Sequence, residues 1–193
     1  PISMISKEIL QQQIPNNLQG TNFNIGEKYG GKVRDNYIID NKRILITTDK
    51  ISAFDRILCT IPFKGQVLNQ ISTFWFEQTK DICPNHVLEV PDPNAIIGKQ
   101  CEPIHVEMVI RGFITGVTST SAWFNYKKGV RNFCGNQLPE GLVKNQKFDK
   151  PISTPSTKAE KGAHDVSVGK QHLFDNNIID EETYNKMEEI AFK

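Results

Sequence analysis

Alternation of apolar and polar residues near the start of the chain predicts an antiparallel hairpin. Val33, Tyr37 and Ile39 share one parity and would therefore face the same side of a strand. An Asp-Asn pair at residues 40–41 suits a tight turn. A second strand-like run covers residues 43–48, so this part of the chain is predicted to be β-rich.

The spacing of large apolar residues changes to a helical period between residues 66 and 80. Val67, Ile71, Phe74 and Trp75 recur at intervals of three and four residues. Residues with that spacing lie along one face of a helix. We therefore expect an amphipathic helix directly after the β-rich region.

Shorter signals predict the remaining elements. We expect helices over 6–13, over 121–128 and after Asp180, and strands over 87–90 and 104–114. Residues 129–163 are rich in Gly, Pro, Lys and Asn and are predicted to be mostly loop. A loop of that length inside a compact domain is uncommon and is often functional.

Composition narrows the class of partner. The chain has 23 basic and 22 acidic residues and a formal net charge of +1, which argues against a polybasic nucleic-acid arm. Apolar residues make up 38% of the chain, enough for a packed core. No apolar run approaches the roughly 20 residues of a membrane-spanning helix. We therefore expect neither nucleic acid nor a membrane as a partner.

The cysteines and the first residues of the chain indicate the cellular compartment. Cys59, Cys83, Cys101 and Cys134 form no C-x-x-C pair, so we expect reduced thiols, partly in the core. The chain starts without Met and without a charged segment followed by an apolar one, so it lacks a secretory pattern. We expect a cytoplasmic protein.

One candidate site is the run Tyr29-Gly30-Gly31-Lys32-Val33 at the start of a strand. Two glycines let backbone amides approach a phosphate, and the Lys ammonium would meet its charge. The run lacks the G-x-x-x-x-G-K-[ST] pattern and is closer to the glycine-rich hairpin that covers phosphates in kinases. The alternative interpretation is a plain hairpin turn with an exposed Lys.

Three further runs combine charged and hydroxyl side chains. Residues 47–55 could recognise a ribose, or they could form a turn with an Asp cap. Arg111 could bind an anion with its forked guanidinium group, or it could point from the core into solvent. Residues 154–165 suit an anionic ligand, although His164 could equally be a hydrogen-bonded structural residue. No cluster has metal-ligand spacing.

Taken in order, these motifs resemble one family. The motifs are Gly31-Lys32-Val33-Arg34-Asp35, then residues 48–55, then Val109-Ile110-Arg111-Gly112-Phe113-Ile114-Thr115-Gly116, then residues 154–160 with His164-Asp165. They are similar to the ordered motifs of the phosphoribosylaminoimidazole-succinocarboxamide synthase (SAICAR synthetase) family. The resemblance implies an α+β, kinase-like fold with an N-terminal antiparallel β lobe and part of a second α/β lobe. We expect the lobes to cover residues 1–108 and 109–193.

The resemblance also implies an activity and a set of site residues. The family joins L-aspartate to carboxyaminoimidazole ribonucleotide with ATP as co-substrate and Mg²⁺, through an acyl phosphate. The residues implied for the nucleotide are Gly31, Lys32, Val33, Glu107, Met108, Val109 and Lys158. Those implied for the ribonucleotide substrate are Asp55, Arg111, Asp165 and either Ser119 or Ser121, which compete for one role.

The family also carries two acidic segments further along its chains, which supply Mg²⁺ ligands and an Arg for the ribonucleotide phosphate. Neither occurs in these 193 residues. The resemblance therefore implies the front part of a longer enzyme, inactive as a ligase alone, with catalytic residues and metal ligands unassigned. An ATP-dependent small-molecule kinase and a non-catalytic nucleotide-binding module are the alternative functions, and homo-oligomer formation stays open.

Overall fold

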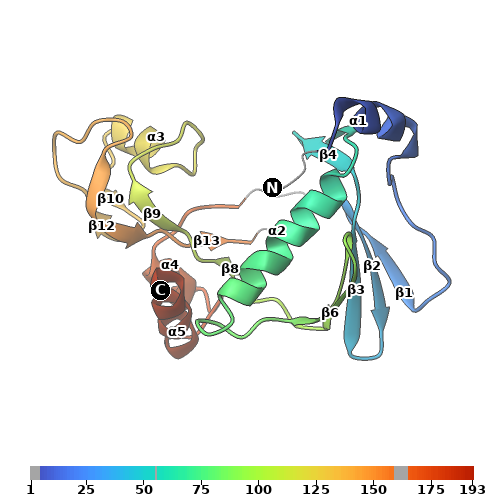
Figure 1. Ribbon diagram of the computed structural model, residues 1–193. Coiled ribbons are helices and arrows are strands. Elements are labelled where there is room, and N and C mark those ends of the chain that lie inside the picture. Colours follow the sequence, from blue (N-terminus) through green and yellow to red (C-terminus); the bar gives the residue numbers. More distant parts are fainter. Residues whose placement is uncertain (1–4, 55, 159–164) are drawn as a thin grey trace. The chain divides into compact units, whose positions relative to one another are not determined.

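The computed structural model describes residues 5–54, 56–158 and 165–193 (Figure 1). Contacts between residues divide the chain into two compact units, Pro1–Glu102 (unit 1) and Pro103–Lys193 (unit 2). Both units combine helices with antiparallel strand pairs, which confirms the predicted α+β class. No helix in the described part of the chain is long and apolar enough to cross a membrane.

A five-stranded antiparallel sheet forms the centre of unit 1. Its strands, in spatial order, are β1 (Glu27–Gly30), β2 (Arg34–Ile39), β3 (Lys42–Thr47), β7 (Ala95–Lys99) and β6 (Val87–Asp92). The predicted hairpin is confirmed as β2–β3, and Asp40 takes the left-handed turn conformation with φ 52°. Tyr37 is fully buried and packs with Ile46 and Ala95.

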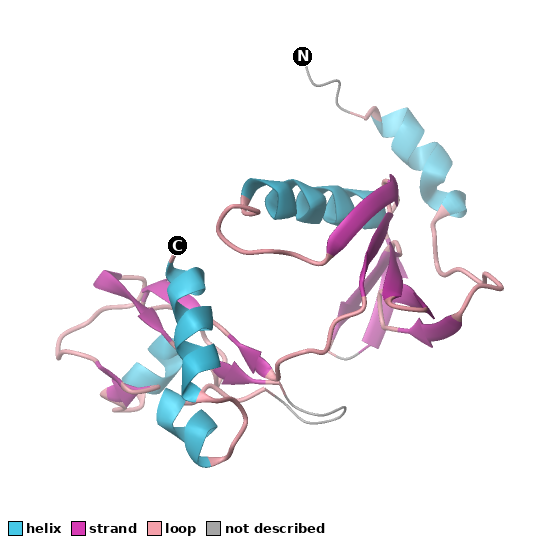
Figure 2. Cartoon of the chain, turned by 90° about the horizontal axis from the view of Figure 1, so that it is seen from below, coloured by secondary structure: helices cyan, strands magenta, loops and turns pink. Residues whose placement is uncertain are grey.

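Unit 1 also contains helices and a second strand pair outside this sheet. They are α1 (Lys7–Gln13), the 3-10 turn η1 (Ile14–Asn16), β4 (Lys50–Ala53), β5 (Arg56–Thr60) and α2 (Lys64–Gln78). Strands β4 and β5 form a separate two-stranded ladder. Helix α2 lies beside the sheet (Figure 2), which confirms the helix predicted for this region.

The packing of α2 depends on small and polar residues. Gly65 lies so close to β3 that an added Cβ would be 2.3 Å from the Thr47 carbonyl oxygen, and buried Asn69 donates to the Ala95 carbonyl at 3.4 Å. The predicted apolar stripe is instead exposed: Ile71 is 52% and Trp75 58% exposed. Helical period alone located the helix but not the face that meets the sheet.

Buried Asp49 joins three segments of unit 1. Its carboxylate accepts the backbone N–H of Leu18 at 2.9 Å and that of Gly65 at 2.8 Å. A negative charge next to the first amides of α2 is stabilised by the helix dipole. Asp49 therefore ties the N-terminal segment and the start of α2 to the end of β3.

The described residues of unit 2 form short strand pairs and three helices. Its elements are β8 (Val106–Glu107), β9 (Ile110–Phe113), α3 (Ala122–Lys127), β10 (Asn132–Phe133), β11 (Asn136–Gln137), β12 (Lys147–Ser153), β13 (Ser156–Thr157), α4 (Lys170–Asp175) and α5 (Glu181–Phe192). The pairs are β9 with β12, β8 with β13, and β10 with β11. One core cluster includes Ile114 and Phe148, and a second includes Val106 and Tyr184.

One prediction for this unit was wrong and another was incomplete. The single strand expected over 104–114 is two strands, β8 and β9, with different partners. Most described residues of the predicted loop over 129–163 lie outside strands, but the segment also contains β10, β11, β12 and β13, of which β12 is seven residues long. Pro151 argues against a strand in the sequence, because Pro cannot donate a backbone hydrogen bond to a ladder. The structure accommodates β12 with a register shift between Lys147 and Ile152.

The helix signals in unit 2 are confirmed. Helix α3 begins after Ser121, and Gly129 just beyond its end has φ +95°. Asp180 caps α5, because its side chain accepts the Thr183 N–H at 2.8 Å. These local capping rules placed both helices without knowledge of the strands between them.

We predict that Asp49→Asn lowers the free energy of unfolding by about 1.5–3 kcal/mol, because one buried N–H loses a charged acceptor. Denaturant unfolding of the 193-residue chain measures this change. Asp40→Asn is the matched control, since Asp40 is exposed and Asn also tolerates the left-handed conformation. Equal stability of the two variants would contradict the role assigned to Asp49.

Candidate functional site

A polar cavity of about 420 Å³ lies within unit 2 and contains five of the predicted site residues. Its lining consists of Glu107, Val109, Arg111, Ser119, Thr120, Ser156, Asp165 and Ser167. The two strand pairs explain the gathering. Pairing of β8 with β13 sets Glu107 opposite Ser156, and pairing of β9 with β12 sets Arg111 opposite Ile152. The third and fourth sequence motifs therefore meet at one cavity.

Arg111 is held firmly at this cavity. Its Nε donates to the Thr154 hydroxyl at 2.8 Å, and its Nη2 donates to the Thr120 carbonyl at 3.0 Å. The guanidinium carbon lies 6.0 Å from the centre of the Phe133 ring. Burial lowers the pKa of Arg111 from its ordinary value, but guanidinium groups stay protonated in proteins. The cavity therefore contains a fixed cation.

Cys134 lies close enough to Arg111 for the two to interact electrostatically. Burial raises the pKa of the Cys134 thiol to about 11, although the Arg111 charge opposes that rise. The thiol is therefore neutral at pH 7 and does not neutralise the guanidinium. The charge of Arg111 stays available to a ligand.

Lys158 forms ion pairs with both carboxylates of the cavity. Its Nζ lies 3.1 Å from Glu107 Oε2 and 3.5 Å from Asp165 Oδ2. The hydrogen bond to Glu107 raises the pKa of Lys158 above its ordinary value. One ammonium group thus faces two carboxylates, and Arg111 supplies a second positive charge to the same cavity.

The two competing serines have different surroundings in the structure. Ser119 is exposed and lines the cavity. Ser121 is buried, donates its hydroxyl to the Thr118 carbonyl at 2.7 Å, and packs against Gly116. Ser121 therefore holds the turn that leads into α3, whereas Ser119 faces the space a ligand could fill.

Several predicted residues lie elsewhere. Met108 packs against the core cluster of Val106 and Tyr184. Asp55 and His164 lie outside the described residues. Sequence reasoning missed Thr120 and Ser167 as cavity residues, because an isolated hydroxyl carries no spacing signal. It included Ser156 and Thr154 in a motif without giving either one a role.

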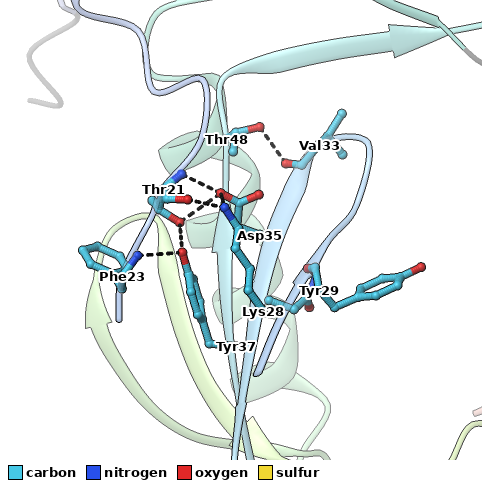
Figure 3. A network of polar contacts seen from close by, with 9 residues as sticks. Thr21, Phe23, Lys28, Tyr29, Val33, Asp35, Tyr37 and Thr48 are labelled. Atoms are coloured by element: carbon cyan, nitrogen blue, oxygen red, sulfur yellow. Dashed lines mark hydrogen bonds and ion pairs between the residues drawn. The ribbon is translucent and has the colours of Figure 1, made fainter. Parts of the chain in front are cut away.

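In unit 1 the glycine-rich run forms a tightly bonded turn. The Gly31 N–H donates to the Arg34 carbonyl at 2.7 Å. The Val33 carbonyl accepts from both the N–H and the hydroxyl of Thr48, at 3.0 and 2.8 Å (Figure 3). Lys32 is exposed between these anchors. The turn is thus held by backbone bonds while the Lys side chain reaches solvent.

Asp35 fixes the strand that follows this turn. Its carboxylate accepts the N–H and the hydroxyl of Thr21 and lies 3.7 Å from Lys28 Nζ (Figure 3). Burial alone would raise the pKa of Asp35, but the Thr21 bonds and the Lys28 charge hold it below its ordinary value. Asp35 therefore serves the fold and is not a free acid.

Metal ligands are not apparent in the part of the chain that the structure describes. Among those residues, no three His, Cys, Asp or Glu side chains gather around a common point. The two carboxylates at the cavity, Glu107 and Asp165, are paired with Lys158. Glu107 and Asp165 therefore give no basis for naming a Mg²⁺ ligand among the described residues.

Comparisons with known proteins agree with one another. Residues 27–193 match the family model described as SAICAR synthetase. The chain is 46% identical over 176 residues to phosphoribosylaminoimidazole-succinocarboxamide synthase from Legionella pneumophila (strain Paris), covering 91% of this chain and 56% of that protein. It is 50% identical over 175 residues to the chloroplastic synthase of Vigna aconitifolia, covering 91% and 51%.

A solved structure supports the same relationship. The SAICAR synthase of Saccharomyces cerevisiae complexed with SAICAR superimposes with a TM-score of 0.75 at 28% identity, over 91% of this chain and 63% of that one. The chain spans about half the length of the curated relatives it matches. With a family match over most of its length and its motifs in the expected order, the chain belongs to the SAICAR synthetase family.

Proposed function

We propose that this chain contributes the ribonucleotide and nucleotide contacts of an ATP-dependent ligase that joins L-aspartate to carboxyaminoimidazole ribonucleotide, yielding SAICAR, ADP and phosphate. The observation that carries the proposal is the fixed Arg111 in the polar cavity of unit 2. Relatives at 46–50% identity bear the synthase name, and the yeast relative binds SAICAR.

The cavity suits a sugar phosphate or carboxylate ligand. Its volume lies in the range of about 300–1,000 Å³ typical of small-molecule sites. Hydroxyl groups of Ser119, Ser156 and Ser167 line it. Ser119 can donate to an anionic oxygen, whereas Ser156 and Ser167 already donate to backbone carbonyls and can accept from a ribose hydroxyl. Because Lys158 offsets part of the negative charge of Glu107 and Asp165, it reduces the repulsion that an anionic ligand meets near Arg111.

The chemistry requires activation of a carboxylate. A carboxylate oxygen of the ribonucleotide attacks the γ-phosphorus of ATP, and ADP leaves. The aspartate amine then attacks the acyl carbon, loses a proton, and expels phosphate. Fixed cations favour such steps because they stabilise negative charge that develops on oxygen. Arg111 is our candidate for holding the carboxylate or the phosphate of the ribonucleotide.

Lys32 in unit 1 is our candidate for an ATP phosphate contact. It is exposed on a turn whose backbone is fixed at Gly31 and Val33. A fixed turn presents an ammonium group with little loss of backbone freedom on binding. The nucleotide roles of Glu107, Met108, Val109 and Lys158, the requirement for Mg²⁺ and the cytoplasmic location remain predictions.

The deciding experiment is an ADP-release assay on the natural-length protein that carries this sequence. We expect ADP release with ATP, Mg²⁺ and carboxyaminoimidazole ribonucleotide to depend on L-aspartate, with SAICAR formed in equal amount. ADP release without aspartate would favour a kinase instead. Nucleotide binding without any turnover would favour a binding module.

We predict opposite selectivity for two variants of that protein. Lys32→Ala should cost about 1.5–3 kcal/mol of ATP binding and leave the ribonucleotide KM nearly unchanged. Arg111→Lys should raise the ribonucleotide KM or lower kcat, because Lys cannot form two parallel bonds, while ATP binding stays the same.

Steady-state kinetics with each substrate varied in turn, together with calorimetry for ATP, measures both effects. Lys42→Ala is the control for Lys32, because Lys42 lies at the opposite end of the β2–β3 hairpin. Arg131→Lys is the control for Arg111, because Arg131 lies outside the cavity lining. Loss of ATP binding in Arg111→Lys would place Arg111 on the nucleotide instead.

A second pair of variants separates the competing serines. Ser121→Ala should lower the free energy of unfolding by about 1 kcal/mol, since the Thr118 carbonyl loses its hydroxyl donor. Ser119→Ala should change it by less than about 0.5 kcal/mol but raise the ribonucleotide KM. Unchanged KM in Ser119→Ala, with a raised KM in a folded Ser121→Ala, would reverse the assignment.

A further inference from the structure

Two nitrogens along one edge of the Arg111 guanidinium are already bonded within unit 2. Nε donates to Thr154 Oγ1 and Nη2 donates to the Thr120 carbonyl. An Arg side chain has five N–H donors in a rigid planar fork. Because Nε and Nη2 form the side edge of that fork, the end edge, which contains Nη1, is the one that remains for a ligand in the cavity.

The Thr154 hydroxyl can only be the acceptor in its hydrogen bond with Arg111. It donates its single hydrogen to the Val109 carbonyl at 3.1 Å, so it must act as the acceptor for Arg111 Nε. The Thr154 N–H donates to the same carbonyl at 2.9 Å. Thr154 is fully buried, although it is 43 positions from Arg111 in the sequence.

Two neighbours restrict rotation of the guanidinium. The Thr120 carbonyl that accepts from Nη2 also accepts the Ser167 hydroxyl at 3.1 Å, which anchors it. The Phe133 ring packs near the guanidinium with a centre distance of 6.0 Å. With its side edge bonded and an aromatic ring beside it, the cation has a defined orientation before any ligand arrives.

We propose that Thr154 is a positioning residue: by accepting from Arg111 Nε it turns the Nη1 edge of the guanidinium toward the cavity, where that edge binds an oxyanion of the ligand. The ligand group is a carboxylate or a phosphate oxyanion, both of which match two parallel N–H donors. The inference rests on the proposed function for the identity of the natural ligand. Thr154 itself does not touch the ligand.

A ligand-free measurement tests the geometry first. In the 193-residue chain, hydrogen exchange of the Arg111 Nε–H, followed by NMR, should be slow in the original protein and in Thr154→Ser. It should be fast in Thr154→Val, which keeps the volume but lacks the acceptor. Thr154→Cys, with a weak acceptor, is the second variant should the Val form fail to fold. Slow exchange in both Val and Cys variants would overturn the proposal.

A binding measurement tests the consequence. Calorimetry with ribose 5-phosphate and with imidazole-4-carboxylate, used as separate probes on the same chain, identifies which anion the Nη1 edge prefers. For the preferred probe we expect a loss of about tenfold or more in Thr154→Val and less than about threefold in Thr154→Ser. Equal losses in folded Val and Ser variants would indicate a packing role and overturn the proposal, as would an unchanged affinity in both.

Kinetics of the natural-length protein complete the test. Thr154→Val should raise the ribonucleotide KM with little effect on the ATP KM, and Thr154→Ser should restore it. Absence of aspartate-dependent turnover in the original protein would refute the proposed ligase function alone. The exchange and probe-binding results would then still decide whether Thr154 positions Arg111 for an anion.

Discussion

The pairing of residues 106–113 with residues 147–157 is the constraint on which unit 2 depends. Two short antiparallel ladders, β8 with β13 and β9 with β12, bring these distant segments together. A single strand over 104–114 would present one continuous edge. The break between β8 and β9 lets Val109 accept two bonds from Thr154 and so fixes the strand beside Arg111. The cavity follows from that junction.

The buried acids in the motifs of unit 1 hold segments of the fold together. Asp35 and Asp49 are both nearly inaccessible, and each carboxylate accepts backbone N–H groups from segments far along the chain. An ionised carboxylate is tolerated in such a place because several donors replace its water. These motif acids therefore stabilise the fold of unit 1 by joining distant segments.

Sequence patterns predicted the elements whose signals are local. The β2–β3 turn, the caps of α3 and α5, and helix α2 all follow from a few adjacent residues. The family motifs predicted Glu107 for the nucleotide, and Arg111, Asp165 and either Ser119 or Ser121 for the ribonucleotide. The structure brings Glu107, Arg111, Ser119 and Asp165 to one cavity. Strand β12 could not be predicted, because the partner of a strand has no periodic signal in the sequence. The cavity residues Thr120 and Ser167 could not be predicted, because an isolated hydroxyl residue has no spacing pattern.

The positive charges of Lys158 and Arg111 have different surroundings. Lys158 is half exposed and already meets Glu107 and Asp165, so solvent and two carboxylates share its charge. Arg111 meets only neutral acceptors among the partners described, namely a hydroxyl and a carbonyl, and the nearby Cys134 thiol is neutral. A half-buried cation with neutral partners keeps most of its field. An incoming oxyanion therefore gains more from Arg111 than from Lys158, and ligand orientation in the cavity follows from that difference.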